Sequence, residues 1–445
     1  MPIVLLDERD KAELQEQIAN SLKGSPNLQY FDTLENIVAV INSGGVEDYI
    51  GTDKELSQGY VYIDADNVPN VVLTKDIGVS AIINITADMN LNLNGKCITM
   101  ALGARFNIGS SNEHDVNVKL DGKTEGSKIT KSVDTTTAGE ALVYCYGNME
   151  VVGGDYFIGV NSAGTTVYGI VSHSGGSTTI KDAKISAELL VSMPAGKATY
   201  AVYCNGILNI DNCDIKVYTA SRLGCCVYTN KGESKITNTK AFADSRSGSE
   251  SYSAELGNGY GVRTQPNTVS TIINCDIYGV HNGCTAQGVT VIKNCVLRGT
   301  GHGGVYATGD NSLCYVENSR IESAKYEGNH KTEYKYFTQE QDVIVPAQYD
   351  ETGIYVGVGN NTSVYLDNCK IVGGKQGALV LRGSDGEQNN SVYMSNCTIE
   401  TDYKARIDNN TLKLYVGFGN NFTAEEIGLP EAVVTTNEIY IKRED

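Results

Sequence analysis

The hexapeptide Ile210-Asp211-Asn212-Cys213-Asp214-Ile215 represents a motif that recurs eight times between Ile180 and Ile399. Its pattern is an apolar residue, any residue, Asn, Cys, any residue and a second apolar residue. In all eight copies both flanking positions are apolar, and the residue after the central one is Ala, Cys, Thr or Ser. Such regularity indicates a structural repeat. The other sharp copies are Ile272–Ile277, Ile292–Leu297, Leu366–Ile371 and Met394–Ile399, and the weaker ones are centred on Asp182, Asn238 and Asn318.

The spacing of the copies predicts the architecture. Successive central positions lie between 20 and 50 residues apart, and short alternating stretches with Gly- and Asn-rich turns fill the intervals. No helical stretch between the copies is long enough to cross over a flat parallel sheet. A coil of strands stacked on its predecessor explains both observations. We therefore predict an all-β fold, a right-handed parallel β-helix solenoid.

Over roughly residues 60 to 400 the chain resembles the pectate-lyase-like family of right-handed parallel β-helix proteins. The resemblance implies an inward Asn in each coil, whose amide bonds to the next Asn one strand spacing of about 4.8 Å away. It specifies a fold and leaves the chemistry open. The residues two places after the central position alternate in charge, which favours the same register because stacked opposite charges attract. These residues are Lys184, Asp214, Lys240 and Asp276.

Composition excludes several classes of partner and cofactor. The formal net charge is −18 and no run of Lys or Arg supplies a basic patch, so we expect neither nucleic acid nor an anionic membrane as a partner. Five of the twelve cysteines occupy one repeat position, which predicts buried reduced thiols rather than disulfides or a zinc site. We expect no metal and no cofactor. The start of the chain lacks a secretory signal and no segment could span a bilayer, which predicts synthesis in a host cytoplasm.

Residues 7–23 are predicted to form a short amphipathic helix. Its apolar stripe is Leu14, Ile18 and Leu22, and Gly24 ends it. Such a helix needs a surface to pack against. The opening residues also resemble the acidic N-terminal segments of phage structural and adsorption proteins. That resemblance implies that the stripe anchors the chain to other virion proteins.

A second helix is predicted where Leu34, Ile37, Val38 and Ile41 fall at helical spacing. An open strand edge at each end of a β-helix needs a cap. We therefore divide the chain into four parts. These are a virion-anchoring helix over 1–24, a helical cap or connector over 25–59, the parallel β-helix over 60–421 and a C-terminal cap over 422–445.

Two insertions interrupt the regular coils, Ala243–Gly259 and Glu322–Thr352. Long loops on a rigid solenoid are often functional, and the second is rich in aromatic residues. Tyrosine rings stack on sugar rings and add a hydroxyl for hydrogen bonding. We predict that this insertion contributes ligand-binding residues, namely Tyr326, Tyr334, Tyr336 and Tyr349.

The sequence offers two further candidates for chemistry. His281 and His302 fall on consecutive coils, where Asp310 or Glu317 could complete an acid–base site; two turn or surface histidines are the alternative. Paired carboxylates would serve a glycoside hydrolase. Asp155, Asp182 and Asp211 are candidates for such a pair, and each could equally be a turn or solvated residue. No Arg can be matched to the base of the lyases in this family.

These observations favour a phage tail spike, tail fibre or head fibre that presents a β-helix to host surface polysaccharide. We favour a non-catalytic adhesin and expect a homotrimer, because outward apolar side chains need cover and cyclic symmetry would multiply weak sites. Two alternatives stay open. One is a polysaccharide depolymerase, a hydrolase or lyase, on the same scaffold, and the other is a non-catalytic capsid decoration protein.

Overall fold

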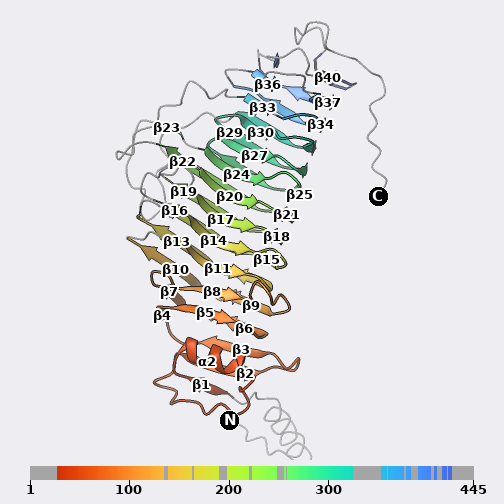
Figure 1. The fold of residues 1–445 in the computed structure, drawn as a ribbon. Helices are drawn as coiled ribbons and strands as arrows, with labels where there is room; N and C mark the ends of the chain where they lie inside the picture. Colours follow the sequence, from red (N-terminus) through yellow and green to blue (C-terminus); the bar gives the residue numbers. More distant parts are fainter. Residues whose placement is uncertain are drawn as a thin grey trace, which may run out of the picture.

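The structure is a computed structural model. The residues that it describes are 28–134, 139–162, 165–189, 198–219, 223–247, 255–256, 258–323, 352–357, 359–374, 377–381, 389–401, 405–407, 413–417 and 419–422. They form an elongated solenoid of three parallel sheets, which we call sheets A, B and C (Figure 1). Each coil contributes one strand to A, then B, then C. The predicted right-handed parallel β-helix is confirmed.

The first three strands of sheet A pair antiparallel, and all later strands of the sheet pair parallel. β1 pairs antiparallel with β2, β2 pairs antiparallel with β3, and parallel pairing starts between β3 and β6. Its strands are β1 (Gln29–Phe31), β2 (Gly59–Ile63), β3 (Pro69–Leu73), β6 (Met89–Asn92), β9 (Asn117–Gly122), β12 (Asn148–Gly153), β15 (Ser177–Lys181), β18 (Ile207–Asp211), β21 (Glu233–Thr237), β25 (Val269–Ile273), β28 (Val289–Lys293), β31 (Leu313–Glu317), β34 (Ser363–Asp367), β37 (Ser391–Ser395) and β40 (Lys413–Val416).

Sheet B follows sheet A in every coil. Its strands are β4 (Ile77–Val79), β7 (Cys97–Met100), β10 (Lys128–Val133), β13 (Asp155–Val160), β16 (Lys184–Leu189), β19 (Asp214–Thr219), β22 (Lys240–Ser247), β26 (Asp276–Gly279), β29 (Val296–Gly299), β32 (Arg320–Ser323), β35 (Lys370–Val372) and β38 (Thr398–Ile399). The short β23 (Glu255–Leu256) pairs antiparallel with β22.

Sheet C closes each coil. Its strands are β5 (Ile82–Ile85), β8 (Arg105–Ile108), β11 (Glu140–Cys145), β14 (Val167–Ser172), β17 (Thr199–Cys204), β20 (Leu223–Thr229), β24 (Asn258–Thr264), β27 (Asn282–Ala286), β30 (Gly303–Ala307), β33 (Thr352–Val356), β36 (Gly377–Leu381) and β39 (Ala405–Ile407).

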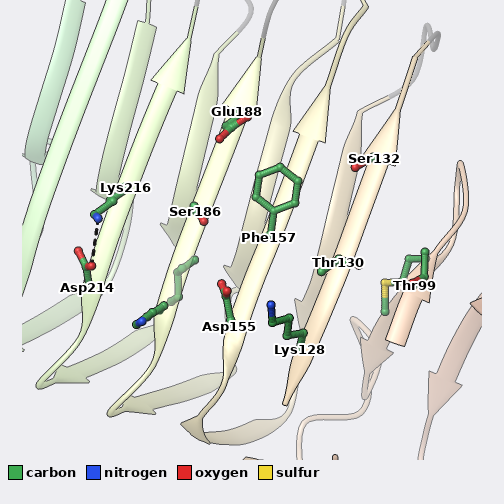
Figure 2. A pocket seen from close by; sticks show the side chains of 13 residues that line it. Thr99, Lys128, Thr130, Ser132, Asp155, Phe157, Ser186, Glu188, Asp214 and Lys216 are labelled. Atoms are coloured by element: carbon green, nitrogen blue, oxygen red, sulfur yellow. Dashed lines mark ion pairs between the residues drawn. The ribbon is translucent and has the colours of Figure 1, made fainter. Parts of the chain in front are cut away.

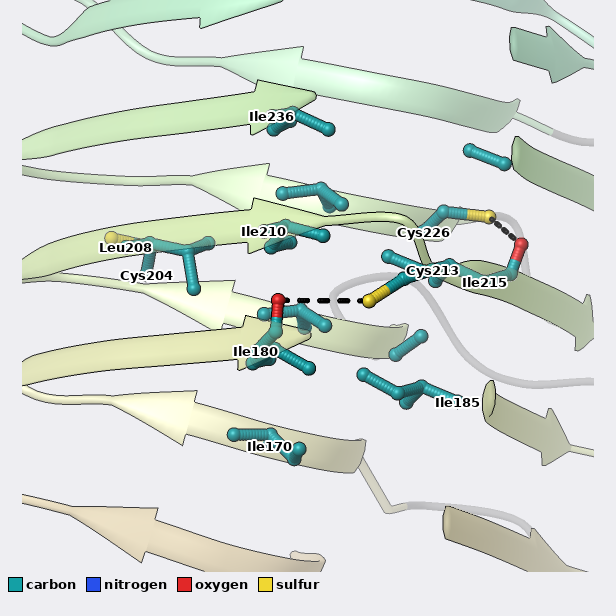
Figure 3. Close-up of a cluster of buried hydrophobic side chains, with 14 of the residues drawn as sticks. Ile170, Ile180, Ile185, Cys204, Leu208, Ile210, Cys213, Ile215, Cys226 and Ile236 are labelled. Carbon is teal, nitrogen blue, oxygen red and sulfur yellow. Dashed lines mark hydrogen bonds between the residues drawn. The ribbon is translucent and has the colours of Figure 1, made fainter. Parts of the chain in front are cut away.

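The core consists of columns of apolar side chains that run along the axis of the solenoid. Ile180, Ile210 and Ile236 are register partners on β15, β18 and β21, and their side chains stack in the interior (Figure 3). All sixteen apolar positions that flank the repeat are buried. The two apolar positions of the motif are therefore one inward residue from sheet A and one from sheet B in each coil.

A two-residue turn joins sheet A to sheet B in all eight repeats, as between β18 and β19. Its first residue has positive φ, between 49° and 56°, in every copy. Asn and Asp tolerate this left-handed conformation better than other residues with a Cβ, which explains the central position. The Asn side chains are exposed and do not point inward as predicted. The reason is geometric, because the second residue of the turn occupies the interior instead.

The amide ladder forms on the outside of this turn and is interrupted. Asn274 donates to Asn238 Oδ1 at 3.1 Å, and Asn294 donates to Asn274 Oδ1 at 3.2 Å. Asn238, however, donates to Asp211 Oδ1 at 2.7 Å rather than to the preceding Asn. An ionised carboxylate is a stronger acceptor than an amide oxygen, so a neighbouring Asp takes the bond.

The small residue after each Asn faces the core, as predicted for the cysteines. Cys275 Sγ donates to Ile273 O at 3.2 Å, and Ser319 Oγ donates to Glu317 O at 2.8 Å. A short side chain with an S–H or O–H donor thus binds the carbonyl two residues earlier. Cys213 Sγ also donates to Ile180 O on the preceding coil at 3.7 Å (Figure 3). All twelve thiols are free. Burial raises the pKa of the Cys213 thiol to about 11, which keeps it protonated.

The predicted charge alternation is confirmed and extends further toward the N-terminus. Lys184 pairs in register with Asp214, Asp214 with Lys240, and Lys240 with Asp276. Asp155 precedes Lys184 in the same outward column of sheet B. Opposite charges on adjacent strands stabilise this register.

The predicted second helix is α2 (Leu34–Asn42), and its four apolar residues are buried. Thr33 is its N-cap and accepts a hydrogen bond from the backbone N–H of Asn36. The side chain of Asn42 donates to Asn84 O at 2.7 Å and accepts from Thr86 N at 2.9 Å. It therefore satisfies backbone groups at β5, the first strand of sheet C, which would otherwise form an open edge.

Sheets B and C meet at a crowded corner. A Cβ added at Gly261 would lie 2.2 Å from Ile277 Cγ2 and 2.6 Å from Gly283 O, and one at Gly304 would lie 2.4 Å from Leu297 O. Only glycine fits such a close approach of two backbones. The same corner holds a buried ion pair between Lys131 on β10 and Glu140 on β11, whose side chains are 1% and 2% exposed.

Candidate functional site

The outer face of sheet C carries a continuous row of aromatic side chains, which we call the aromatic band. Its first part lies on β11, β14, β17 and β20, where Tyr203 and Tyr228 are register partners. Their ring centroids are 5.3 Å apart with nearly parallel planes, and those of Tyr168 and Tyr200 are 5.5 Å apart. The members of the band are Tyr144, Tyr168, His173, Tyr200, Tyr203, Tyr228, Tyr260, His281, His302, Tyr306 and Tyr355.

The second part of the band continues along β24, β27, β30 and β33. Ring centroids are 5.4 Å apart between Tyr260 and His281, 4.6 Å between His281 and His302, and 4.4 Å between His302 and Tyr355. Arg263 joins the two parts, because its guanidinium lies 4.8 Å from the ring centroid of Tyr260 and 5.7 Å from that of Tyr228. Ring contacts of this kind hold the side chains of the band in fixed positions.

Burial sets the protonation of the band. It raises the pKa of Tyr168 and of Tyr260 to about 12, so both hydroxyls stay protonated and can donate hydrogen bonds at neutral pH. Burial, and then the neighbouring His302 and Arg263, hold the pKa of His281 well below its usual value. The imidazole of His281 is therefore neutral, and the fixed positive charge of the second part belongs to Arg263.

The structure brings His281 and His302 together, as the sequence predicted. It engages both predicted carboxylate partners elsewhere. Asp310 accepts a hydrogen bond from the backbone N–H of Asn360 at 2.8 Å, and Glu317 forms an ion pair with Lys293 at 2.8 Å. An acid–base pair between these carboxylates and the histidines is therefore not formed.

Sheet B presents a second surface, an open groove of about 800 Å³ that we call the charged groove (Figure 2). The alternating column of Lys and Asp runs along it, and Phe157 and Lys216 stand beside that column. Lys216 Nζ lies 3.2 Å from Asp214 Oδ2. Glu188 lines the same groove and is buried.

The three candidate carboxylates separate into two groups. Asp155 lines the charged groove. Asp182 is the left-handed residue of a turn and accepts from Asn212 Nδ2 at 2.6 Å. Hydrogen bonds from Thr237 and Asn238 hold the pKa of Asp211 below its usual value. Asp182 and Asp211 thus stabilise the A–B turn. Of the three carboxylates, Asp155 is the one that lines a groove where a ligand could bind.

The predicted ligand-binding and anchoring residues lie outside the described residues. Tyr326, Tyr334, Tyr336 and Tyr349 fall between β32 and β33, the last described strand of sheet B before the insertion and the first of sheet C after it. Leu14, Ile18 and Leu22 fall before residue 28. Both assignments stay predictions.

Sequence reasoning missed the aromatic band, although a signal existed. Tyr168-Gly169-Ile170, Tyr200-Ala201-Val202 and Tyr260-Gly261-Val262 repeat a Tyr, a small residue and a buried β-branched residue. The middle position meets the crowded B–C corner, and the Tyr faces outward on sheet C. A search for this second repeat would have located the band.

Within the described ranges, no group of three or more His, Cys, Asp or Glu side chains is arranged to hold a metal ion. No helix in the same ranges combines the length and apolar character needed to cross a membrane.

Comparison with known proteins found matches among solved structures. No family model matches the chain, and no curated protein matches it. Among solved structures, the crystal structure of the periplasmic alginate epimerase AlgG is similar, with 10% sequence identity, 98% of each chain covered and a TM-score of 0.35. The fold assignment rests on the parallel pairing and register of the three sheets.

Proposed function

We propose that this protein is a virion adhesin that binds an extended surface polysaccharide along the aromatic band. The observation that carries the proposal is the run of contacts from Tyr144 on β11 to Tyr355 on β33, in which the Arg263 guanidinium bridges the rings of Tyr228 and Tyr260. Tyr168, Tyr203 and Tyr228 are half-buried, so each ring is held in place and keeps part of its surface open. Rigid tyrosines are suited to sugar stacking because they lose little conformational freedom on binding.

The spacing of the coils supports a repetitive ligand. Successive strands lie about 4.8 Å apart, which is close to the length of one pyranose ring in an extended chain. A polysaccharide along the axis of the solenoid would meet half-buried tyrosine rings on β11, β14, β17 and β20, then the half-buried Arg263 on β24, and a half-buried ring again at Tyr306 on β30. Many weak contacts in one row add through effective concentration rather than through one deep pocket.

The virion context rests on the N-terminal segment. Its stripe of Leu14, Ile18 and Leu22 and its acidic opening support attachment to other virion proteins. Deletion of residues 1–24 is expected to leave a folded β-helix that no longer joins particles. Particles that still incorporate the truncated chain would contradict the anchor. Light scattering tests the proposed homotrimer, and a monomer mass would refute it.

Binding by the band is tested with polysaccharide purified from the envelope of a host bacterium. The double variant Tyr203→Ala/Tyr228→Ala removes two adjacent rings and is expected to weaken binding about tenfold or more, since each stacking contact contributes on the order of 1 kcal/mol. The matched control is Tyr365→Ala/Tyr393→Ala, which removes two stacked rings from sheet A whose centroids are 4.5 Å apart. Equal losses in both variants would refute the band as the binding surface.

A depolymerase on the same scaffold is the second candidate, and the charged groove favours it. The groove brings together Asp155, Glu188 and Asp214. The backbones at Asp155 and Asp214 are two strand spacings apart, about 9 to 10 Å, close to the carboxyl separation of inverting glycosidases. A reducing-sugar assay on the envelope polysaccharide tests this. Release of reducing ends that Asp155→Asn and Asp214→Asn each abolish would establish the enzyme, and no release would leave the adhesin.

A further inference from the structure

Arg263 differs from the other arginines whose side chains the structure describes. Arg105 Nε donates to Asn107 Oδ1 at 2.9 Å, Arg298 forms an ion pair with Asp276, and Arg320 forms one with Glu322. No hydrogen bond or ion pair joins the Arg263 guanidinium to another described residue, and its Nε is enclosed without a partner.

The surroundings of Arg263 are aromatic. It stands in the outward column of sheet C between Tyr228 on β20 and Thr285 on β27. The rings of Tyr228 and Tyr260 flank its guanidinium, and the buried His281 follows Tyr260 along the band. The half-buried side chain thus holds a fixed positive charge on a largely apolar floor.

This arrangement is costly without a ligand. A guanidinium cannot lose its proton at any physiological pH, so burial cannot neutralise it. Contacts with ring faces compensate for the lost water only in part. The chain has 53 acidic residues, yet none that the structure describes pairs with Arg263. The two terminal Nη groups of the guanidinium are therefore available to an oxyanion, which they can bind through two parallel hydrogen bonds.

We propose that Arg263 binds an oxyanion on a sugar residue of the glycan, a carboxylate, sulfate or phosphate. This inference rests on the proposed function, because the sugar that carries the anion would stack on the half-buried ring of Tyr228 beside Arg263. The net charge of −18 repels polyanions at long range, so the attraction is local to this position. Charge on the ligand thereby selects among glycans that the band alone would bind alike.

The test uses three polymers with one backbone: dextran, carboxymethyl dextran and dextran sulfate, each immobilised on a biosensor. The full chain is expected to bind at least one charged dextran about tenfold more tightly than dextran itself, and Arg263→Gln is expected to abolish that preference. Arg298→Gln is the matched control, because it removes the same charge from an arginine that is already paired. It should leave the preference unchanged. The two charged polymers distinguish a carboxylate from a sulfate ligand.

Three outcomes would overturn the anion site. They are equal binding of all three polymers, an undiminished preference in Arg263→Gln, and failure of both charged polymers to bind. None of them refutes the adhesin, which is judged separately on envelope polysaccharide. Should Arg263→Gln fail to fold, Arg263→Lys takes its place, since the ammonium keeps the charge but loses the two-pronged contact. A preference reduced to about one third or less in that variant supports the site, and an unchanged preference overturns it.

Discussion

The two corners that border sheet B are built in opposite ways. From sheet A the chain turns into sheet B through two residues in each of the eight repeats. From sheet B into sheet C the connection varies from residues 280–281 to residues 324–351. The constant corner fixes the register of neighbouring coils. The variable corner accepts insertions without disturbing the stack, and the aromatic band lies on the sheet that follows it.

The corners also differ in what stabilises them. Exposed amides and left-handed Asn residues hold the A–B corner, as at Asn274. Buried groups hold the B–C corner, where Gly261 allows close packing and Lys131 pairs with Glu140. Solvent can replace lost hydrogen bonds at the first corner and cannot do so at the second. Substitutions at the B–C corner are therefore expected to cost more free energy.

The largest effect is expected at the buried ion pair. Lys131 Nζ also donates to Ala104 O at 2.7 Å and Ala141 O at 3.3 Å, which orders it inside the coil. Glu140→Gln removes the countercharge and leaves an ammonium in the core. The free energy of unfolding should fall by about 3 to 5 kcal/mol. Urea denaturation measures it.

The control for this experiment replaces both partners. Lys131→Met/Glu140→Leu removes both buried charges. The free energy of unfolding of this variant is expected to be unchanged, or higher than that of the native chain by roughly 1 to 4 kcal/mol. A double variant as unstable as Glu140→Gln would show that packing at the corner, rather than the unpaired charge, causes the loss.

Alkaline pH should lower the free energy of unfolding, because the buried tyrosines of the band must stay protonated in the folded chain. Burial raises the pKa of Tyr260 to about 12 in the folded chain, above the ordinary value of 10.0. Unfolding therefore releases a proton in this range, and stability falls as pH rises from 10 to 12. The loss for Tyr260 alone is about 2 to 3 kcal/mol, from 1.36 kcal/mol per pH unit. Urea denaturation between pH 9 and pH 11.5 measures the slope, and Tyr260→Phe should reduce it. An unchanged slope in that variant would refute the assignment.

A smaller loss is expected from a methyl group at the crowded corner. Gly261→Ala places a Cβ against Ile277 Cγ2 and the carbonyl of Gly283. Overpacking of this kind costs about 1 to 3 kcal/mol. Gly78→Ala is the matched control on β4, because its new Cβ would meet only Thr99 O at 4.0 Å. Its stability should change by less than about 0.5 kcal/mol. Thermal unfolding compares the two, and equal shifts would contradict the asymmetry of the corners.

The same contrast explains what the sequence could predict. A turn of constant length keeps the same spacing between residues in every copy. The buried columns that contain Ile210, Cys213 and Ile215 could therefore be recognised in the sequence as a repeated motif. The direction of Asn212 was predicted wrongly. Its φ of 52° turns the side chain outward. A repeated Asn can reflect either a buried side chain or a left-handed backbone, and the sequence alone does not distinguish the two.

The aromatic band was harder to predict because its members meet only after each coil closes. Tyr168 and Tyr200 lie far apart in sequence, with a connection of variable length between them. Their ring contact depends on the register across β14 and β17, which connection length does not determine. Arg263 had no sequence signal, since its property is the lack of a partner among the residues described around it.

The smallest effect is expected at the constant corner. Asn274 has a φ of 56°, donates to Asn238 and accepts from Asn294. Asn274→Ala should lower the free energy of unfolding by about 1 to 2 kcal/mol, because a Cβ without a local hydrogen bond is strained in the left-handed region. Asn274→Gly removes the same ladder bonds but adopts this φ without strain, so it should recover most of the loss. Urea denaturation of both variants separates the two contributions. Equal losses of unfolding free energy in the two variants would show that the hydrogen bonds of the amide ladder, rather than the backbone conformation, provide the stability. The exposed ladder would then contribute to stability as the buried groups of the B–C corner do.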